Sequence, residues 1–230
     1  MKIVLVLLGI TSVLIIAFTQ FIWNSVPEFW LYGAEIGNVL FNLSIGYLSA
    51  FIFYIIDIWI PGLQKRKRVN FRVKMPLNRI VSFMEAPLVN IVKRYGEDSK
   101  NINTLSSEEF KEITERIDLI NDQGDLFFID ANRNANFGEY LYYHVEKVEE
   151  YINSILKMPF EYEIELLELL DQIERSKYHE MLNSIKNLSG FRGPVQAKGE
   201  AISNTVYEYY YLCSQLKKYM NKQGILEEVS

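Results

Sequence analysis

Cysteine and histidine are scarce in this sequence. Cys213 is the only cysteine, which excludes an intramolecular disulfide framework, and the 230 residues include two histidines. There is no P-loop, dinucleotide fingerprint, G-x-S-x-G or paired-cysteine motif. The formal net charge of -5 gives no support to a protein that coats nucleic acid, because such a protein needs a basic surface. We therefore expect no enzyme, no metal site and no cofactor.

Charge is almost missing from the first quarter of the chain. Residues 1–61 hold one Lys, no Arg and three acidic residues. Residues 3–22 carry no charge, and residues 36–60 carry only Asp57. Twenty helical residues rise roughly 30 Å, which matches the hydrocarbon core of a bilayer. The sequence therefore predicts a transmembrane hairpin over residues 1–61, with spans at about 3–22 and 36–60.

Basic residues predict the orientation of this hairpin. The loop between the spans contains no Lys or Arg, whereas a basic juxtamembrane segment at 62–79 follows the second span. Its seven basic residues are Lys65, Arg66, Lys67, Arg68, Arg72, Lys74 and Arg79. By the positive-inside rule we expect this segment and both termini to be cytoplasmic. One alternative is that residues 1–22 are a cleaved signal peptide, although Trp23 follows them and no A-x-A site ends them.

The second predicted span differs from the first because polar residues recur along it every three or four positions. This stripe consists of Glu35, Asn38, Asn42, Gly46, Ser49 and Asp57, with Phe53 in the same row. Such spacing places the residues on one helical face, and polar groups that face lipid are costly. The stripe either packs, against the first span or a second copy, or lines a cation conduit. A hairpin cannot enclose a conduit alone, so the second interpretation requires a cyclic homo-oligomer.

The basic segment at 62–79 has three possible roles. It can act only as a topology signal, it can bind anionic lipid headgroups, or it can bind an anionic nucleotide. A second possible ligand site lies in the glycine-containing loop 190–199, where Arg192 and Lys198 are candidates for contact with an anion.

Residues 80–230 predict an all-α cytoplasmic domain of five or six helices. Apolar residues recur at helical spacing from Leu77 to Val92, where Pro87 kinks or splits the helix. A capping box at Ser106–Glu109 begins the next helix, which we expect to end at Asp122–Asp125. Leu126–Ile129 reads as a strand or a buried loop. Later helices are predicted up to Pro159, over 161–185 with a break near Ser176, and at the C-terminal end of the chain.

For several residues of this domain, the sequence predicts whether the side chain is buried or exposed. His144 lies on an apolar stripe and is expected in the core, whereas His179 is expected to be exposed. Cys213 lies on the apolar face of the last helix and is expected to be buried and reduced. The tyrosine clusters at 140–143 and 207–211 predict core contacts, with the remaining rings in a helix interface or on a surface where bases stack.

The segments Tyr32–Asn38 and Asn42–Tyr54 resemble the second span of a broad group of bacterial two-span membrane proteins. This group includes membrane effectors of anti-phage defence, among them the effector of Hailong systems. The resemblance implies an inner-membrane protein whose cytoplasmic helical domain senses a nucleotide-derived signal. It also implies spans that then open a channel or disrupt the membrane and stop the infected cell.

Two functions follow as expectations. The first is a homo-oligomeric inner-membrane effector that forms or gates an ion-conducting pore under control of its helical domain, in abortive infection. Its partners are other copies of the chain, the bilayer and an activating nucleotide or oligonucleotide. The second is a membrane-tethered scaffold or sensor, without a pore, that recruits a cytosolic protein.

Overall fold

A computed structural model describes residues 2–21, 33–96, 105–129, 132–189 and 200–226. The chain divides into two compact units, Met1–Arg68 and Val69–Ser230, which we call the N-terminal unit and the helical unit. The boundary falls inside one long helix and inside the predicted basic segment. Residues 62–79 are therefore not an element of their own.

The N-terminal unit contains α1 (Lys2–Phe21) and α2 (Gly33–Tyr54). Both helices are long and apolar enough to cross a membrane, and windows of 18 residues reach a mean hydropathy of 2.4 and 2.0. Only 17% of the apolar stretch in the first helix is buried, and only 6% of that in the second. The core helix of a globular protein is instead mostly buried. In α1 the hydroxyls of Thr11, Ser12 and Thr19 donate to carbonyls one turn earlier, so these polar groups are satisfied within the helix.

One face of α2 packs against α1. Gly37 and Ser44 are buried there, and the Tyr47 hydroxyl donates to the carbonyl of Leu5 at 3.0 Å. A Cβ added to Gly9 would lie 3.1 Å from the Phe51 ring, so α1 approaches α2 closely because Gly9 has no side chain.

Helix α2 continues into a π-helical turn, η2 (Ile55–Trp59), and then into α3 (Ile60–Tyr95). Pro76 and Pro87 both lie inside α3, so Pro87 does not split the helix. A proline inside a helix costs about 3 kcal/mol. Nine buried residues from Val73 to Val92 offset this cost, since burying one large apolar side chain is worth about 1.5–3 kcal/mol. The helix ends at Tyr95, directly before Gly96.

Helix α4 (Ser107–Thr114) begins at the predicted capping box, in which Ser106 and Glu109 exchange hydrogen bonds. It ends well before Asp122, so its predicted extent is wrong. The Asp118 carboxylate accepts hydrogen bonds from the backbone N–H groups of Ile120 and Asn121, which favours a turn over another helical turn.

The structure is mostly helical, in agreement with the predicted all-α class, and the described residues add one short β-hairpin to the helices. Strands β1 (Gln123–Phe128) and β2 (Arg133–Asn136) form an antiparallel pair between α4 and α5. The apolar run at 126–129 is thus largely a strand, one of its two predicted forms. The sequence does not predict strand β2 (Arg-Asn-Ala-Asn), because it has none of the β-branched or aromatic residues that are typical of strands.

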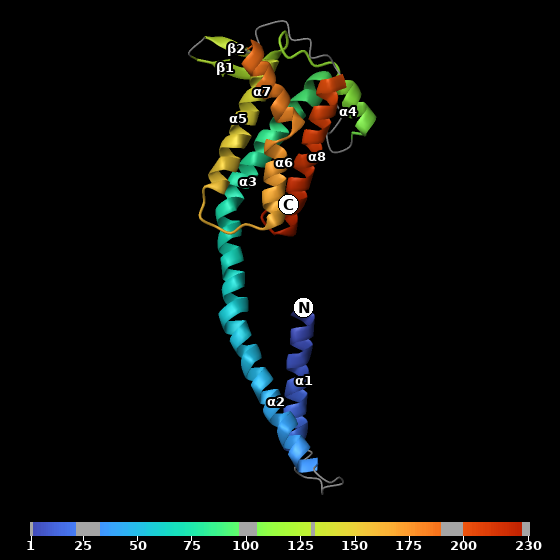
Figure 1. The fold of residues 1–230 in the computed structure, drawn as a ribbon. Coiled ribbons are helices and arrows are strands. Elements are labelled where there is room, and N and C mark those ends of the chain that lie inside the picture. Colours follow the sequence, from blue (N-terminus) through green and yellow to red (C-terminus); the bar gives the residue numbers. More distant parts are fainter. Residues whose placement is uncertain (1, 22–32, 97–104, 130–131, 190–199, 227–230) are drawn as a thin grey trace. The chain divides into compact units, whose positions relative to one another are not determined.

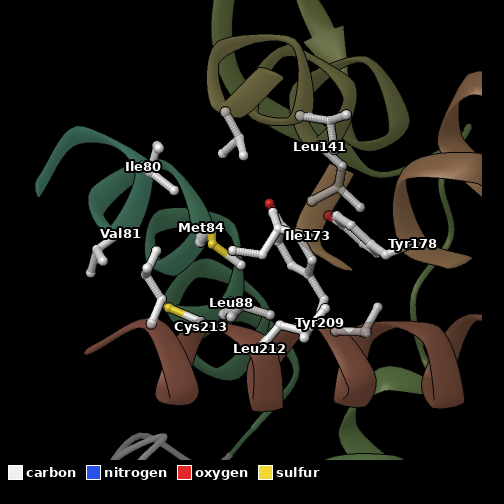
Figure 2. Close-up of a cluster of buried hydrophobic side chains, with 14 of the residues drawn as sticks. Ile80, Val81, Met84, Leu88, Leu141, Ile173, Tyr178, Tyr209, Leu212 and Cys213 are labelled. Carbon is white, nitrogen blue, oxygen red and sulfur yellow. The ribbon is translucent and has the colours of Figure 1, made fainter. Parts of the chain in front are cut away.

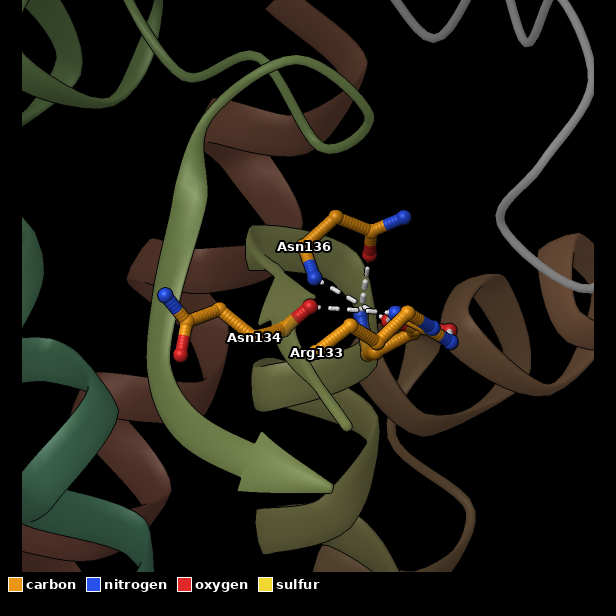
Figure 3. A network of polar contacts seen from close by, with 4 residues as sticks. Arg133, Asn134 and Asn136 are labelled. Carbon is orange, nitrogen blue, oxygen red and sulfur yellow. Dashed lines mark hydrogen bonds and ion pairs between the residues drawn. The ribbon is translucent and has the colours of Figure 1, made fainter. Parts of the chain in front are cut away.

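Helix α5 (Phe137–Leu156) is capped by a network that also holds β2. The Glu139 carboxylate accepts two hydrogen bonds from Arg133, at 2.7 and 2.6 Å, and one from the backbone N–H of Asn136 at 3.0 Å. The Asn136 side chain accepts from the Glu139 N–H at 2.8 Å, which completes a capping box. Figure 3 shows Arg133, Asn134 and Asn136 in this network.

Removing the cap with Asn136→Ala is expected to destabilise the helical unit by about 1 kcal/mol, because it leaves a helix N-terminal donor without its acceptor. The thermal unfolding midpoint of the full chain in detergent should fall by about 2–4 °C. Asn134→Ala is the matched control, since this side chain is exposed, and it should leave the midpoint unchanged. Equal midpoints for both variants would contradict the role of the cap.

The remaining helices are α6 (Ile164–Glu174), α7 (Lys177–Ser189) and α8 (Glu200–Lys222), so the predicted break near Ser176 is confirmed. The apolar face predicted for the last helix is buried: Ile202, Val206, Tyr209, Cys213, Leu216 and Met220. These side chains meet the inner faces of α3, α5, α6 and α7 in one core (Figures 1 and 2). In Figure 2, Tyr209 and Cys213 of α8 lie close to Met84 and Leu88 of α3.

Candidate functional site

The polar stripe of the N-terminal unit is the strongest candidate site, and it faces away from α1. Its six predicted residues are all exposed: Glu35, Asn38, Asn42, Gly46, Ser49 and Asp57. Nothing lies within 4 Å of the position that a Cβ at Gly46 would take. The opposite face of α2 carries Gly37, Ser44 and Tyr47, which contact α1 or are buried near it. Among the described residues, the side chains of the stripe therefore form no hydrogen bonds with the first helix, α1.

The stripe is continuous over α2 and reaches its end in η2. Glu35 lies in the first turn of α2, and Asp57 lies in the π-helical turn. Neither Asn38 nor Asn42 makes a side-chain hydrogen bond among the described residues, so their amides are open to water or to another molecule. An exposed amide can donate and accept hydrogen bonds, and a carboxylate attracts cations.

The predicted basic residues all lie on α3. Lys65, Arg66, Lys67, Arg68, Arg72 and Arg79 are exposed, whereas Lys74 is half-buried. Their exposure suits contact with an anionic surface of any kind. Arg192 and Lys198, the candidates in the loop before α8, lie outside the described residues.

His144 is a core residue, as predicted. Its Nδ1 lies 2.9 Å from the carbonyl of Tyr140, and the rings of Phe83, Tyr140 and Tyr143 surround it. Burial lowers the pKa of His144, so the ring is neutral at neutral pH. Among the described residues no group of three His, Cys, Asp or Glu side chains is placed to hold a metal ion.

His179 was expected to be exposed, and that prediction is wrong. Its side chain is 0% exposed, because the first turn of α7 lies between α5 and α8. Nε2 lies 3.2 Å from the Tyr209 hydroxyl, and Nδ1 lies 3.3 Å from Oε1 of Glu149 at an angle unsuited to a good hydrogen bond. Tyr178 and Tyr209 stack with ring centroids 4.4 Å apart. Neighbouring Tyr178 and His179 are both buried, which helical periodicity alone does not indicate.

The cluster of Glu149, His179 and Tyr209 links α5, α7 and α8. Contact with His179 lowers the pKa of Glu149, and Asn183 donates to the same carboxylate at 3.5 Å. The hydroxyls of Tyr178 and Ser203 are buried and have no hydrogen-bond partner among the described residues. We interpret the cluster as a buried polar contact that fixes how the three helices pack.

The Glu149 contact predicts an acid-sensitive part of the stability. The pKa of Glu149 in the folded chain lies below its ordinary value of 4.5, so its contribution is present above about pH 4.5 and is lost as the pH falls below that value. Glu149→Gln should therefore lower the unfolding midpoint at pH 7, and this difference from the parent should shrink as the pH falls below about 4.5. Glu150→Gln, at a more exposed carboxylate, should follow the parent curve. A constant difference between Glu149→Gln and the parent at every pH would contradict this assignment.

Cys213 is buried, as predicted, and burial raises the pKa of its thiol to about 12. At neutral pH it is therefore a protonated thiol rather than a nucleophile or metal ligand. The tyrosines divide between the core and the surface, since Tyr140 and Tyr209 are buried while Tyr207 and Tyr211 are exposed.

Comparison of this chain with protein-family models, with curated proteins and with solved structures finds no match. The class that the structure defines is a mostly helical protein with two apolar helices long enough to span a membrane, followed by a separate helical unit.

Proposed function

We propose that the chain is a homo-oligomeric inner-membrane effector that forms an ion-conducting pore controlled by its helical unit. The observation that supports this proposal is the position of the polar stripe. It lies on the face of α2 opposite α1, where no hydrogen-bond partner for Asn38 or Asn42 is found in the described part of the chain. Because polar groups facing lipid are costly, the stripe of a spanning helix needs protein or water beside it. Copies arranged around an axis supply both.

The chemistry of the stripe supports a path for cations. Asn38, Asn42 and Ser49 offer oxygen atoms that replace part of an ion's hydration shell. Glu35 and Asp57 stand towards the two ends of the stripe, where rings of carboxylates would concentrate cations. With the basic residues after Ile60 on the cytoplasmic side, Asp57 is near the inner mouth and Glu35 is near the outer mouth.

Control by the helical unit and a role in anti-phage defence belong to the same proposal. They rest on the sequence resemblance of residues 32–54, which implies activation by a nucleotide or oligonucleotide. The exposed basic residues of α3 suit an anionic activator as well as anionic lipid.

Conductance of the reconstituted full chain tests the pore. Asn42→Leu and Ser49→Leu should each reduce the single-channel current, because they remove polar groups from the conduit. Leu43→Ala is the matched control, since Leu43 is exposed on α2 beside the stripe, and it should leave the current unchanged. Unchanged current in both stripe variants would refute a conduit here. An oligomer that never conducts would instead support a tethered scaffold whose stripe only joins its copies.

A further inference from the structure

One exposed face of α3 in the helical unit combines apolar and basic side chains. Phe71 is 78% exposed and Met75 is 68% exposed, although both are large apolar residues. Arg72 and Arg79 are exposed on the same stretch, and neither makes an ion pair among the described residues. No acidic residue occurs from 62 to 84. Exposed large apolar side chains beside unpaired charges are typical of an interaction surface.

A second exposed face, on α6, combines apolar and acidic side chains. Ile164 is 73% exposed and Leu167 is 37% exposed. Glu168 and Asp171 are exposed beside them, and α6 contains four acidic residues and no basic one. Asp171 forms an ion pair with the exposed Arg175 one turn later, at 3.0 Å. The charge of this α6 face is opposite to that of the α3 face, and both faces carry exposed apolar side chains.

The two faces lie at the same level of the helical unit. The Asn70 side chain donates to the Gln223 carbonyl at 3.3 Å, and the Gln223 side chain donates to Glu163 at 2.6 Å. Asn70 and Glu163 thus lie near one end of the unit, the C-terminal end of α8, and both α3 and α6 run from there towards the strands (Figure 1). At ~1.5 Å per residue, Arg72–Arg79 and Ile164–Asp171 occupy the same first turns above that end.

We propose that the α3 face of one copy packs against the α6 face of the next copy, head to tail around a ring. This inference rests on the homo-oligomer of the proposed function, and it names the contact that joins the helical units. Copies in a closed ring are related by rotation about one axis, so a given residue has the same position along that axis in every copy. Two faces can therefore meet around the ring only if they lie at the same position along the axis. The α3 and α6 faces meet this condition when the axis runs along these helices. This contact buries four exposed apolar side chains away from water: Phe71, Met75, Ile164 and Leu167. The opposite charges fix how the two faces align.

Charge reversal in the full chain tests this contact. The variant Arg72→Glu/Arg79→Glu presents two acidic faces, and Glu168→Arg/Asp171→Arg presents two basic faces. Each alone should therefore lose the oligomeric mass measured by light scattering in detergent, with unchanged circular dichroism. Combining all four substitutions in one chain should restore the mass, and so should mixing the two double variants, because both cases bring opposite charges together again.

Oligomeric mass retained by both double variants would overturn the contact, as would loss of mass that neither combination restores. Weaker binding to vesicles that contain phosphatidylserine, with unchanged mass, would also overturn it and assign Arg72 and Arg79 to the lipid surface. These outcomes are separate from a failure of the proposed function, which would appear as a parent protein that is monomeric or does not conduct.

Discussion

Replacing Asn42 by Lys is expected to lower the cation current through the reconstituted protein strongly, whereas Asn42→Asp should increase its preference for cations. Asn42 lies near the middle of α2, is exposed, and is on the face opposite the contact with α1. In a ring of copies one Lys from each would form a ring of positive charge at the centre of the bilayer. Such a ring repels cations and favours anions, so we expect the cation current to fall more than about tenfold.

Reversal potentials in asymmetric KCl measure this change directly. The two charged variants should shift the reversal potential in opposite directions, and Asn42→Leu should lower the current without reversing the selectivity. Identical reversal potentials for Asn42→Lys and Asn42→Asp would show that ions do not pass this position. Expression of each variant in the membrane fraction is the control for correct insertion.

The largest effect on stability is expected in the helical unit at Tyr209. Its side chain is 1% exposed, stacks on Tyr178 and has its hydroxyl 3.2 Å from His179. Tyr209→Ala should cost about 3–5 kcal/mol, because it removes a large ring and leaves a cavity. Tyr209→Phe keeps the ring but leaves the buried His179 nitrogen without its partner, at a cost of about 1–3 kcal/mol.

Urea denaturation followed by circular dichroism separates the two effects. Tyr211→Ala is a matched control, because this tyrosine of the same helix is 56% exposed, and it should change the free energy of unfolding by less than about 1 kcal/mol. Equal losses for Tyr209→Ala and Tyr209→Phe would mean that the hydrogen bond, and not the packing, holds α7 against α8.

Regular patterns in the sequence predict much of this fold. The alternating three- and four-residue spacing of apolar residues in α8 predicts its buried face correctly, and the capping box at Ser106 predicts the start of α4. The uncharged runs predict the two apolar helices of the N-terminal unit. These features depend on residues close together along one helix, where periodicity and capping determine the structure.

Sequence patterns do not predict the features that depend on contacts between distant segments of the chain. His179 is buried because α7 begins between α5 and α8, and neighbouring Tyr178 is buried with it. Strand β2 exists because it pairs with β1 and is held by Arg133 and Glu139, despite a poor strand sequence. Spacing also puts the stripe on one face, but only the structure shows that α1 packs on the opposite face.

Cross-linking between introduced cysteines tests the central claim that the stripe of one copy faces other copies. Cys213 is the only native cysteine and is buried, so the background reaction should be low. In membranes containing the full chain, Ser49→Cys should give covalent dimers and larger species with a short bismaleimide, whereas Leu43→Cys, beside the stripe on α2, should remain monomeric. Cross-linking at Leu43→Cys but not at Ser49→Cys would show that the stripe faces away from the other copies, and the account would be wrong.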